Sequence, residues 1–513
     1  MTDNAAADIA DDTEVVIEAP CGDLLGRWGS GVARFAGIPF AAPPTGQRRF
    51  RPPEPAAKWD GVRNALHFAP ICPQNPSMMD ALFGGEAEQW DEDCLHLNVW
   101  SPKPEGDADL PVMVWIHGGG FEMGSGSSPL YHGESFARDG VVYVSINYRL
   151  GSLGFLELGH LDPELAGSGN VGLLDQVAAL RWVRDNISSF GGDPGNVTIF
   201  GESAGAMSVS LLLAMPEAEG LFSKVISQSG ALATAKAPAQ AAADTEEFMA
   251  HAAVDSVDAL RDLPIEQLLA AHAAMSAARM AEPEEVIRRF GSPLAFLAFR
   301  PVADGAAVPT DAIAKVAAGE VPRVPLLIGS NLEEWKLFAM MAPGSQSTDD
   351  LRERLKMLTP SPDEALAVYE SEHPGASPAD LESAALTDVV FRIPATQMAE
   401  AHAAHSDVWQ YRFDWRSPAL GGLLGAAHAI EIPFVFDMVE DHRLHVLVGA
   451  EAPVALSRGV HAAWVAFART GSPELDGVGW PSRSGGSRPV LVLDNEVTLV
   501  DDPQSATREF WAR

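Results

Sequence analysis

A single serine-centred motif constrains this chain more than any other feature. Gly201-Glu202-Ser203-Ala204-Gly205 follows the apolar, strand-like run VTIF (197–200) and precedes the helix-like run AMSVSLLLAM (206–215). A serine with glycine two positions away on either side, between a strand and a helix, sits on a sharp turn that presents its hydroxyl at the end of a sheet. The motif therefore predicts an α/β fold and makes Ser203 the candidate nucleophile.

The strand before this motif belongs to a succession of strand-like and helix-like segments. From Leu110 the chain runs through PVMVWI, VVYVSI, GLLDQVAALRWVRDNI, VTIF and KVISQSG. Apolar strands that alternate with helices form a mostly parallel sheet covered on both faces. Earlier apolar runs at 14–17, 24–28 and 32–35, separated by Gly and Pro turns, predict an antiparallel start. The expected fold class is α/β, with a large, mixed, mostly parallel central sheet and helices on both faces.

Two Ala-, Glu- and Leu-rich stretches, at about 231–320 and 340–405, predict helical insertions. Strand character resumes after them, at PLLIGS (325–330) and WQYRFDW (409–415). Both stretches therefore interrupt one sheet and are not expected to be domains of their own. We expect residues 1–12 to be a flexible N-terminus and residues 13–513 to form a single domain.

The charge balance excludes some classes of partner. The 513 residues carry 35 Lys and Arg against 70 Asp and Glu, a formal net charge of −35. This charge repels phosphate backbones and anionic membranes, so we expect no nucleic-acid partner and no membrane partner. The first twenty residues show no basic, apolar leader, and no window approaches 18 uninterrupted apolar residues. The expected location is therefore the cytoplasm.

A serine hydroxyl becomes a good nucleophile only when a base removes its proton and an acid orients that base. In this kind of fold both follow the serine, with the acid first. Among the 14 histidines, His428 stands out because it follows a glycine-containing stretch and precedes the apolar run IPFVF. His402 and His405 lie in a helical Ala/His stretch and are expected on the surface. Glu333 and Glu334 follow PLLIGS, and the pattern does not choose between them.

A glycine run follows the strand PVMVWI, in His117-Gly118-Gly119-Gly120-Phe121. Glycines there can turn successive backbone N–H groups toward one point, where each stabilises a negative oxygen by about 3–4 kcal/mol. The N–H of Ala204, the residue after the candidate nucleophile, would be the third donor. The run lacks the Lys and Ser/Thr of a phosphate-binding loop. His117 is expected to brace the loop and not to act as a base.

With these residues identified, the chain resembles the type B carboxylesterase family of α/β hydrolases, which includes cholinesterases and bacterial p-nitrobenzyl esterases. The similarity runs from about residue 15 to 500 and is carried by FAGIPFAAPPTGQRRFRPP, EDCLHLNVW, VWIHGGGF, NYRLGSLGF, FGGDPGNVTIFGESAG and HAIEIPFVF. The resemblance implies the α/β-hydrolase fold and a Ser-Glu-His triad. The family's spacing places the acid on Glu334 and the base on His428, and the oxyanion donors on Gly119, Gly120 and Ala204.

The resemblance also implies two roles and exposes one departure. Cys72 and Cys94 coincide with the family's N-terminal disulfide, which in the chain-entropy model is worth roughly 3 kcal/mol, although a reducing cytoplasm can leave it open. Ser229 becomes a candidate for supporting the triad. Trp335 stands where the family usually has glycine after its acid, so Glu333 stays open as an alternative acid.

Together, the residues and the resemblance predict a serine carboxylesterase that hydrolyses short to medium acyl or aryl carboxylic esters through an acyl-enzyme intermediate. Its partner is a small-molecule ester, and its chemistry needs no metal and no organic cofactor. The alternative is a carbamate or amide hydrolase with the same triad. The remote alternative is a catalytically inactive scaffold or adhesion relative. Apolar candidates for the substrate pocket, for which core packing is the more common role, are Phe83, Trp90, Met123, Trp335 and Phe338.

Overall fold

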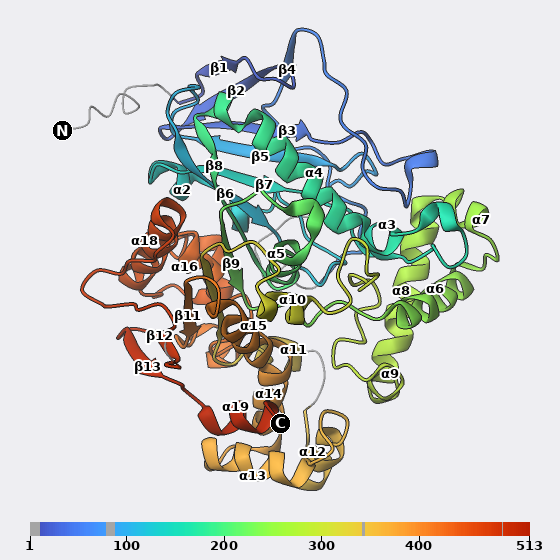
Figure 1. Cartoon of the computed structure of the whole chain (residues 1–513), viewed down its shortest axis with the longest axis vertical. Helices are drawn as coiled ribbons and strands as arrows, with labels where there is room; N and C mark the ends of the chain where they lie inside the picture. Colours follow the sequence, from blue (N-terminus) through green and yellow to red (C-terminus); the bar gives the residue numbers. More distant parts are fainter. Residues whose placement is uncertain (1–10, 78–87, 341–343, 485) are drawn as a thin grey trace.

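The computed structural model describes residues 11–77, 88–340, 344–484 and 486–513. Phe83 and residues 1–10 of the predicted flexible N-terminus lie outside the described residues. Asp12 is tied to the fold, because its backbone N–H donates to the carbonyl oxygen of Trp28 at 2.9 Å. One large sheet crosses the molecule, with helices on both of its sides (Figure 1).

The sheet has 13 strands in the order β1-β2-β3-β5-β7-β6-β8-β9-β10-β11-β12-β13, with β4 paired to β2. The strands are β1 (Glu14–Ile17), β2 (Asp23–Gly29), β3 (Val32–Pro39), β4 (Val62–Asn64), β5 (His96–Ser101), β6 (Leu110–Ile116), β7 (Val142–Ile146), β8 (Gly192–Glu202), β9 (Lys224–Gln228), β10 (Leu326–Asn331), β11 (Val408–Phe413), β12 (Pro489–Leu493) and β13 (Thr498–Asp501). From β7 to β12 in spatial order all neighbours are parallel, whereas β1, β2, β3, β5 and β7 pair antiparallel, as do β12 and β13. The predicted antiparallel start and mostly parallel core are confirmed.

The helices occupy the predicted intervals between strands. They are α2 (Glu134–Arg138), α3 (Gly151–Phe155), α4 (Val171–Asn186), α5 (Ala204–Ala214), α6 (Pro238–Ala252), α7 (Val257–Arg261), α8 (Ile265–Ala281), α9 (Pro283–Phe290), α10 (Ala312–Ala318), α11 (Lys336–Ala339), α12 (Thr348–Leu355), α13 (Pro362–Glu372), α14 (Pro378–Thr387), α15 (Ile393–Ala403), α16 (Ile432–Val435), α17 (His445–Val448), α18 (Val454–Thr470) and α19 (Ser505–Trp511). Helices α6 to α10 separate β9 from β10, and α11 to α15 separate β10 from β11. A π-helical turn, η8 (Asp388–Arg392), joins α14 to α15. That the whole forms one domain stays a prediction.

Alternating side chains of the strands form a separate apolar core on each face of the sheet. In β8, Val197 and Ile199 belong to the core that includes Leu211 of α5. Phe200 belongs to the opposite core, with Trp464 of α18. A side-chain period of two residues produces this division. The parallel strands β8 and β10 end at the same edge of the sheet, and this edge carries Ser203 and, shortly after β10, Glu334.

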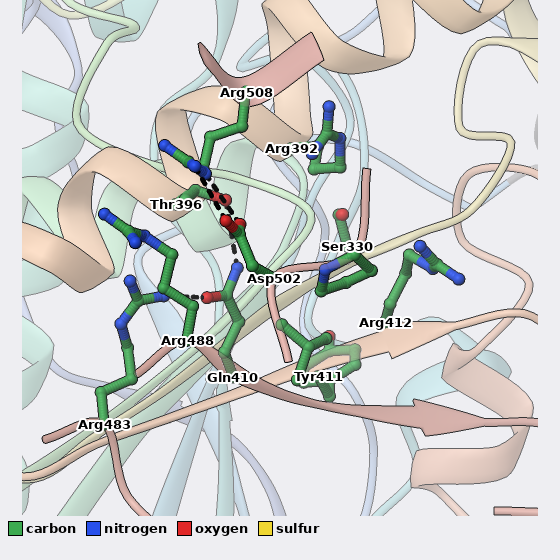
Figure 2. A pocket seen from close by; sticks show the side chains of 12 residues that line it. Ser330, Arg392, Thr396, Gln410, Tyr411, Arg412, Arg483, Arg488, Asp502 and Arg508 are labelled. Atoms are coloured by element: carbon green, nitrogen blue, oxygen red, sulfur yellow. Dashed lines mark hydrogen bonds and ion pairs between the residues drawn. The ribbon is translucent and has the colours of Figure 1, made fainter. Parts of the chain in front are cut away.

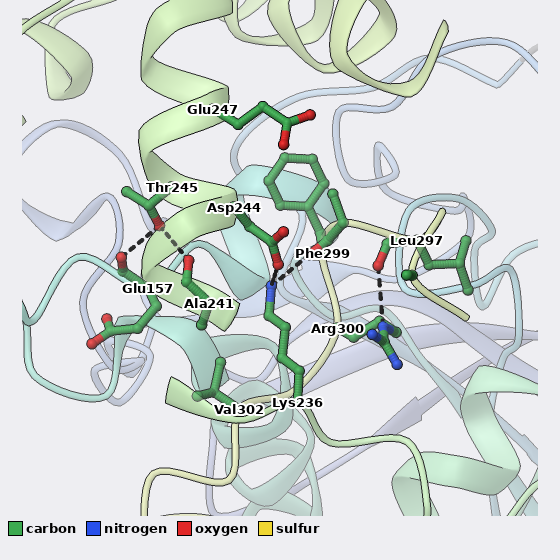
Figure 3. A network of polar contacts seen from close by, with 12 residues as sticks. Glu157, Lys236, Ala241, Asp244, Thr245, Glu247, Leu297, Phe299, Arg300 and Val302 are labelled. Carbon is green, nitrogen blue, oxygen red and sulfur yellow. Dashed lines mark hydrogen bonds and ion pairs between the residues drawn. The ribbon is translucent and has the colours of Figure 1, made fainter. Parts of the chain in front are cut away.

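The first insertion is held by buried charges (Figure 3). Lys236 Nζ and Arg279 Nη2 each lie 2.6 Å from a carboxylate oxygen of Asp244 on α6. Burial lowers the pKa of Lys236 to about 8, against the opposing effect of Asp244. In the same region Arg300 Nε donates to the carbonyl oxygen of Leu297 at 3.1 Å. Lys236 Nζ also donates to the carbonyl oxygen of Ala298 at 2.5 Å, so the network holds the segment that carries Leu297.

Candidate active site

Ser203 stands on the turn between β8 and α5. Its backbone has φ 56° and ψ −122°, a region that residues other than glycine seldom adopt. A Cβ atom on Gly205 would lie 1.9 Å from the carbonyl oxygen of Ile116 in β6, and one on Gly201 would lie 2.5 Å from it. The two glycines of the motif are therefore required for the turn to pack against β6. Ser203 is half-buried, while its neighbours in the motif are buried.

His428 and Glu334 form a buried pair. His428 Nδ1 lies 2.7 Å from Glu334 Oε2, and the backbone N–H of His428 donates to the carbonyl oxygen of Glu334 at 3.2 Å. The other oxygen, Glu334 Oε1, accepts the backbone N–H of Asn331 at 2.7 Å. A carboxylate on Nδ1 keeps the proton there and leaves Nε2 free to accept one.

Glu333, the alternative acid, is engaged elsewhere. Its carboxylate lies 2.8 Å from Lys336 Nζ and 2.9 Å from Arg416 Nε, and it accepts the backbone N–H of Ala426 at 3.0 Å. Although burial opposes it, hydrogen bonding to these three groups lowers the pKa of Glu333 below its usual value. Of the two adjacent carboxylates, the structure brings only Glu334 to His428.

The sequence analysis missed Glu202, which contacts the other side of the imidazole. Glu202 Oε1 lies 3.0 Å from His428 Nε2, and the glutamate side chain is only 4% exposed. Within the part of the chain that the structure describes, no hydrogen bond joins Ser203 Oγ to His428 Nε2. The signal that could have found Glu202 is its position: it ends β8 and immediately precedes the candidate nucleophile.

A third buried carboxylate, Glu431, completes this cluster and was also missed. It accepts the side-chain amides of Asn331 at 2.7 Å and Gln228 at 3.2 Å. Burial raises its pKa, and nearby Glu334 adds to the effect. Its place three residues after His428, on the same short stretch, is the signal that could have found it. We call Glu202, Glu334 and Glu431 the carboxylate cluster.

The carboxylate cluster changes the protonation of its members. Burial raises the pKa of Glu202 well above its usual range, although His428 opposes this; Glu431 and Glu334 add to it. Burial alone would lower the pKa of His428, but Glu202 and then Glu334 raise it to about 9. Like charges held out of water favour proton uptake. The cluster therefore favours proton uptake by Glu202 and by His428.

The glycine loop after β6 presents unused backbone donors beside Ser203. Gly119 and Gly120 have φ of 105° and 63°, and a Cβ on Gly118 would lie 3.1 Å from the Cβ of Ser203. Among the described residues, the N–H groups of Gly119, Gly120 and Ala204 donate to no protein atom. Three free donors next to a serine can hold a negative oxygen.

His117 lies below this loop and is neutral. Its ring stacks on Tyr148 with centroids 4.4 Å apart, and the Tyr148 hydroxyl donates to the His117 carbonyl oxygen at 2.9 Å. Burial lowers the pKa of His117 to about 4. These contacts match the expected bracing role.

Aromatic side chains cover the imidazole. The ring of Phe338 lies 5.2 Å from that of His428, and Trp335 packs on Phe338 at 4.9 Å. Phe391 of η8, which the sequence analysis did not single out, lies 4.8 Å from the same imidazole. Leu297 lies beside the glycine loop, 3.1 Å from the position of a Cβ on Gly120.

Three other candidates from the sequence, Ser229, Trp90 and Met123, lie in three different environments. Ser229 is buried, with φ 57°, and its backbone N–H donates to the carbonyl oxygen of Gly329; its Oγ has no partner among the described residues. Trp90 is 38% exposed. The backbone of Met123 lies against Gly119, since a Cβ on that glycine would lie 2.1 Å from the Met123 carbonyl oxygen.

The structure has all three cysteines as free thiols. Cys72 and Cys94 are buried, and hydrogen bonding to Cys72 together with burial raises the pKa of Cys94 well above its usual range. Cys72 Sγ also accepts the backbone N–H of Leu150 at 3.2 Å. The disulfide implied by the resemblance is therefore not formed here, although the two thiols are neighbours, and it stays a prediction.

The expectation that His402 lies on the surface is wrong. Its side chain is buried, and its Nε2 lies 2.8 Å from the carbonyl oxygen of Val324, which precedes β10. Helical composition alone does not show which face of α15 meets the sheet. His405 lies 2.9 Å, through Nε2, from the carbonyl oxygen of Ala317 at the end of α10.

The geometry agrees with comparisons to known proteins. The sequence model of the carboxylesterase family matches residues 13–511. This chain belongs to the carboxylesterase family. It is 40% identical over 505 residues to the para-nitrobenzyl esterase of Bacillus subtilis (strain 168), covering 97% of this chain and 98% of that protein. Carboxylesterase membership makes the protein a carboxylic ester hydrolase.

A more distant relative and a solved structure support the same family and fold. The carboxylesterase is 34% identical over 525 residues to the cholinesterase of Mus musculus, covering 94% of this chain and 83% of that protein. The solved structure of a thermophilic PNB esterase matches with a TM-score of 0.85 and 38% identity, over 97% of this chain and 99% of that one. Relatives of this similarity share the α/β-hydrolase fold, which confirms the expected fold class.

The described residues, 11–77, 88–340, 344–484 and 486–513, lack two further features. None of the helices in these ranges is long and apolar enough to cross a membrane. The same ranges hold no group of three or more His, Cys, Asp and Glu residues arranged to bind a metal ion.

Proposed function

We propose that this carboxylesterase hydrolyses short to medium acyl or aryl carboxylic esters through an acyl-enzyme on Ser203. The observation that carries the proposal is the 2.7 Å contact of His428 Nδ1 with Glu334, placed beside a strained serine turn. The unused N–H groups of the glycine loop support it. A nucleophile, an oriented base and an oxyanion site are the three parts that acyl transfer requires.

The cycle begins when His428 Nε2 takes the proton from the Ser203 hydroxyl as its oxygen attacks the ester carbonyl carbon. The carbonyl oxygen becomes negative and accepts hydrogen bonds from the N–H groups of Gly119, Gly120 and Ala204. The C–O bond to the alcohol then breaks, and His428 gives its proton to the departing oxygen. Water repeats the sequence on the acyl-enzyme and releases the acid and free Ser203.

Glu334 and Glu202 act on different nitrogens of the base, His428. Glu334 holds the Nδ1 proton and stabilises the imidazolium that forms in each step. Only neutral His428 can accept the Ser203 proton. Because burial raises the pKa of Glu202, that carboxyl, 3.0 Å from Nε2, can hold a proton and leave His428 neutral.

The surroundings of the site favour apolar esters of modest size. Phe338 and Phe391 cover His428, and Leu297 lies against the glycine loop. Apolar walls with a few converging polar groups are typical of small-molecule sites. The para-nitrobenzyl esterase relative supports aryl esters among the substrates.

A series of p-nitrophenyl esters from acetate to decanoate tests the proposal. We expect activity to peak at short to medium acyl chains and to fall by about 10⁵-fold or more in Ser203→Ala, because the nucleophile is lost. Circular dichroism checks that the variant folds. Equal activity of the variant and the wild type would contradict the role of Ser203, and a preference for emulsified triolein would contradict the chain-length range.

Carbamate or amide hydrolysis is the second candidate, since it uses the same groups and differs in the leaving group. A relative named phenmedipham hydrolase, from Pseudarthrobacter oxydans, is 36% identical over 502 residues, so relatives at similar identity carry different substrate names. A p-nitrophenyl carbamate measured beside the acetate separates the two. We expect the ester to have the higher kcat/KM, and the reverse would favour the second candidate.

A further inference from the structure

A second cluster of charge lies away from the carboxylate cluster, on the α15 side of the sheet. A pocket between α15, the C-terminal segment and strands β10 to β12 is lined by Arg392, Arg412, Arg483, Arg488 and Arg508 (Figure 2). It is a small pocket, with a cavity volume of about 20 Å³. We call it the arginine pocket. It gathers five of the 35 basic residues of a chain whose net charge is −35.

Three of these arginines each have a carboxylate of their own. The pairs are Arg392–Asp388, Arg412–Asp414 and Arg508–Asp502, with shortest N···O distances of 2.5, 2.6 and 2.7 Å. Arg508 also reaches the exposed Glu509 at 3.2 Å. Their charges are compensated within the protein.

The other two arginines share one carboxylate. Arg488 Nε lies 2.7 Å from Glu400 Oε1, and Arg483 Nη2 lies 3.4 Å from the same oxygen. Glu400 is 38% exposed, so water weakens its field. Among the described residues no second carboxylate forms an ion pair with either arginine. The pair therefore carries one positive charge more than its ion-pair partner offsets.

The uncompensated positive charge has its highest free-energy cost at Arg483, because this side chain is buried. Its side chain is only 5% exposed, and its shortest hydrogen bond, 2.6 Å from Nη1, goes to the neutral amide oxygen of Gln410. Burial lowers its pKa, and Arg488 and Arg508 lower it further, against Glu400 and Asp502. A guanidinium does not lose its proton near neutral pH, so it needs an anion for compensation.

The pocket also offers a neutral donor. Ser330, at the end of β10 beside Arg412 of β11, is buried, and its hydroxyl points into the pocket (Figure 2). Its Oγ makes no hydrogen bond within the described part of the chain. Guanidinium groups present planar pairs of N–H donors that match the oxygen spacing of phosphate, and a hydroxyl adds a further contact.

We propose that the arginine pocket binds a small oxyanion of the phosphate type, either inorganic phosphate or the phosphate group of a small organic ligand. The anion compensates Arg483 and Arg488 and lies on a different side of η8 from His428: Phe391 contacts the imidazole, and the next residue, Arg392, lines the pocket. The anion site is thus separate from the ester site.

Calorimetric titration of the full chain with inorganic phosphate, at constant ionic strength set with chloride, tests this site. We expect saturable binding of one equivalent to the wild type and affinity weaker by about tenfold or more in Arg483→Gln and Arg488→Gln, because each loses a charged donor. Arg184→Gln is the matched control: it removes an exposed arginine whose partner is Asp185, and it should bind like the wild type.

Hydrolysis of p-nitrophenyl acetate shows that each variant is folded. If Arg483→Gln does not fold, Arg488→Gln decides the test, because the Arg488 side chain is 32% exposed and its replacement is easier to accommodate. A parallel titration with glycerol phosphate separates the sources: tighter binding than inorganic phosphate assigns an organic ligand, and weaker binding assigns the free anion. Absence of saturable binding of both to the wild type, or wild-type affinity in Arg488→Gln, would overturn the proposal.

Discussion

Near His428, three buried carboxylates act on one imidazole, whereas in the arginine pocket two of five guanidinium groups share a single carboxylate, Glu400. The carboxylate cluster reduces its excess charge by binding protons, because the pKa values of Glu202 and Glu431 rise on burial. The arginine pocket has no such means, since guanidinium stays charged at all physiological pH values. Buried acids can therefore be compensated by solvent protons, while buried arginines require a carboxylate of the protein or a separate anion.

The two clusters are joined by one short element. η8 places Phe391 against the imidazole of His428 and Arg392 in the arginine pocket, where it pairs with Asp388 of the same turn. Single π-helical turns within α-helices occur frequently at functional sites. The carboxylate cluster takes up protons, whereas the arginine pocket is compensated by an anion. This contrast leads to three predictions.

The largest effect is expected from Glu334→Gln. An amide on Nδ1 no longer stabilises the imidazolium and can favour the wrong tautomer of His428, so kcat on p-nitrophenyl acetate should fall by about 10⁴-fold. Glu333→Gln is the matched control, because the neighbouring carboxylate pairs with Lys336 and Arg416. It should retain kcat within a few-fold. Equal losses in the two variants would show that the carboxylate next to His428 has no special role.

Glu202→Gln should have a smaller effect, seen in the pH dependence. His428 acts only when neutral, so kcat/KM should be present above its pKa and be lost as pH falls through it. Burial lowers this pKa, but Glu202 and Glu334 raise it from the ordinary 6.5 to about 9. Removing the Glu202 charge destabilises the imidazolium, so the midpoint should move to lower pH. A midpoint that does not move would show that Glu202 carries no charge over the measured range.

The smallest effect is expected from Arg488→Gln on the same pH profile. The largest causes of the shift in the pKa of His428 are burial and the charges of the carboxylate cluster, and none of them is an arginine of the pocket. The midpoint measured for p-nitrophenyl acetate should therefore equal that of the wild type, with or without phosphate. A displaced midpoint in this variant would mean that the two clusters are coupled electrostatically across η8.

Local patterns in the sequence predicted the strands, helices and turns that are determined by residues close together along the chain. The run at 14–17 is β1, and the glycines around Ser203 predicted the turn that the backbone adopts. The choice between Glu333 and Glu334 required the chain's path after β10, since adjacent side chains point in different directions. Only the family spacing of the resemblance favoured Glu334 beforehand.

The parts of the fold and of the site that were not predicted arise from contacts between residues far apart in the sequence. Glu202 reaches His428 Nε2 from the end of β8, and Glu431 reaches Asn331 at the end of β10. His402 is buried because α15 lies on β10 and β11. The arginine pocket combines residues from 330 to 508. No spacing in the sequence marks such convergence, because each residue alone has the pattern of an ordinary surface charge.

The central claim is that Ser203 carries the acyl group, and acid quenching within milliseconds of mixing wild-type enzyme with p-nitrophenyl acetate tests it most directly. Peptide mass spectrometry of the quenched protein should find one acetyl group, on Ser203, and none in Ser203→Ala treated in the same way. An acetyl group on a different residue, or hydrolysis at the full wild-type rate without any acetylated protein, would contradict the account.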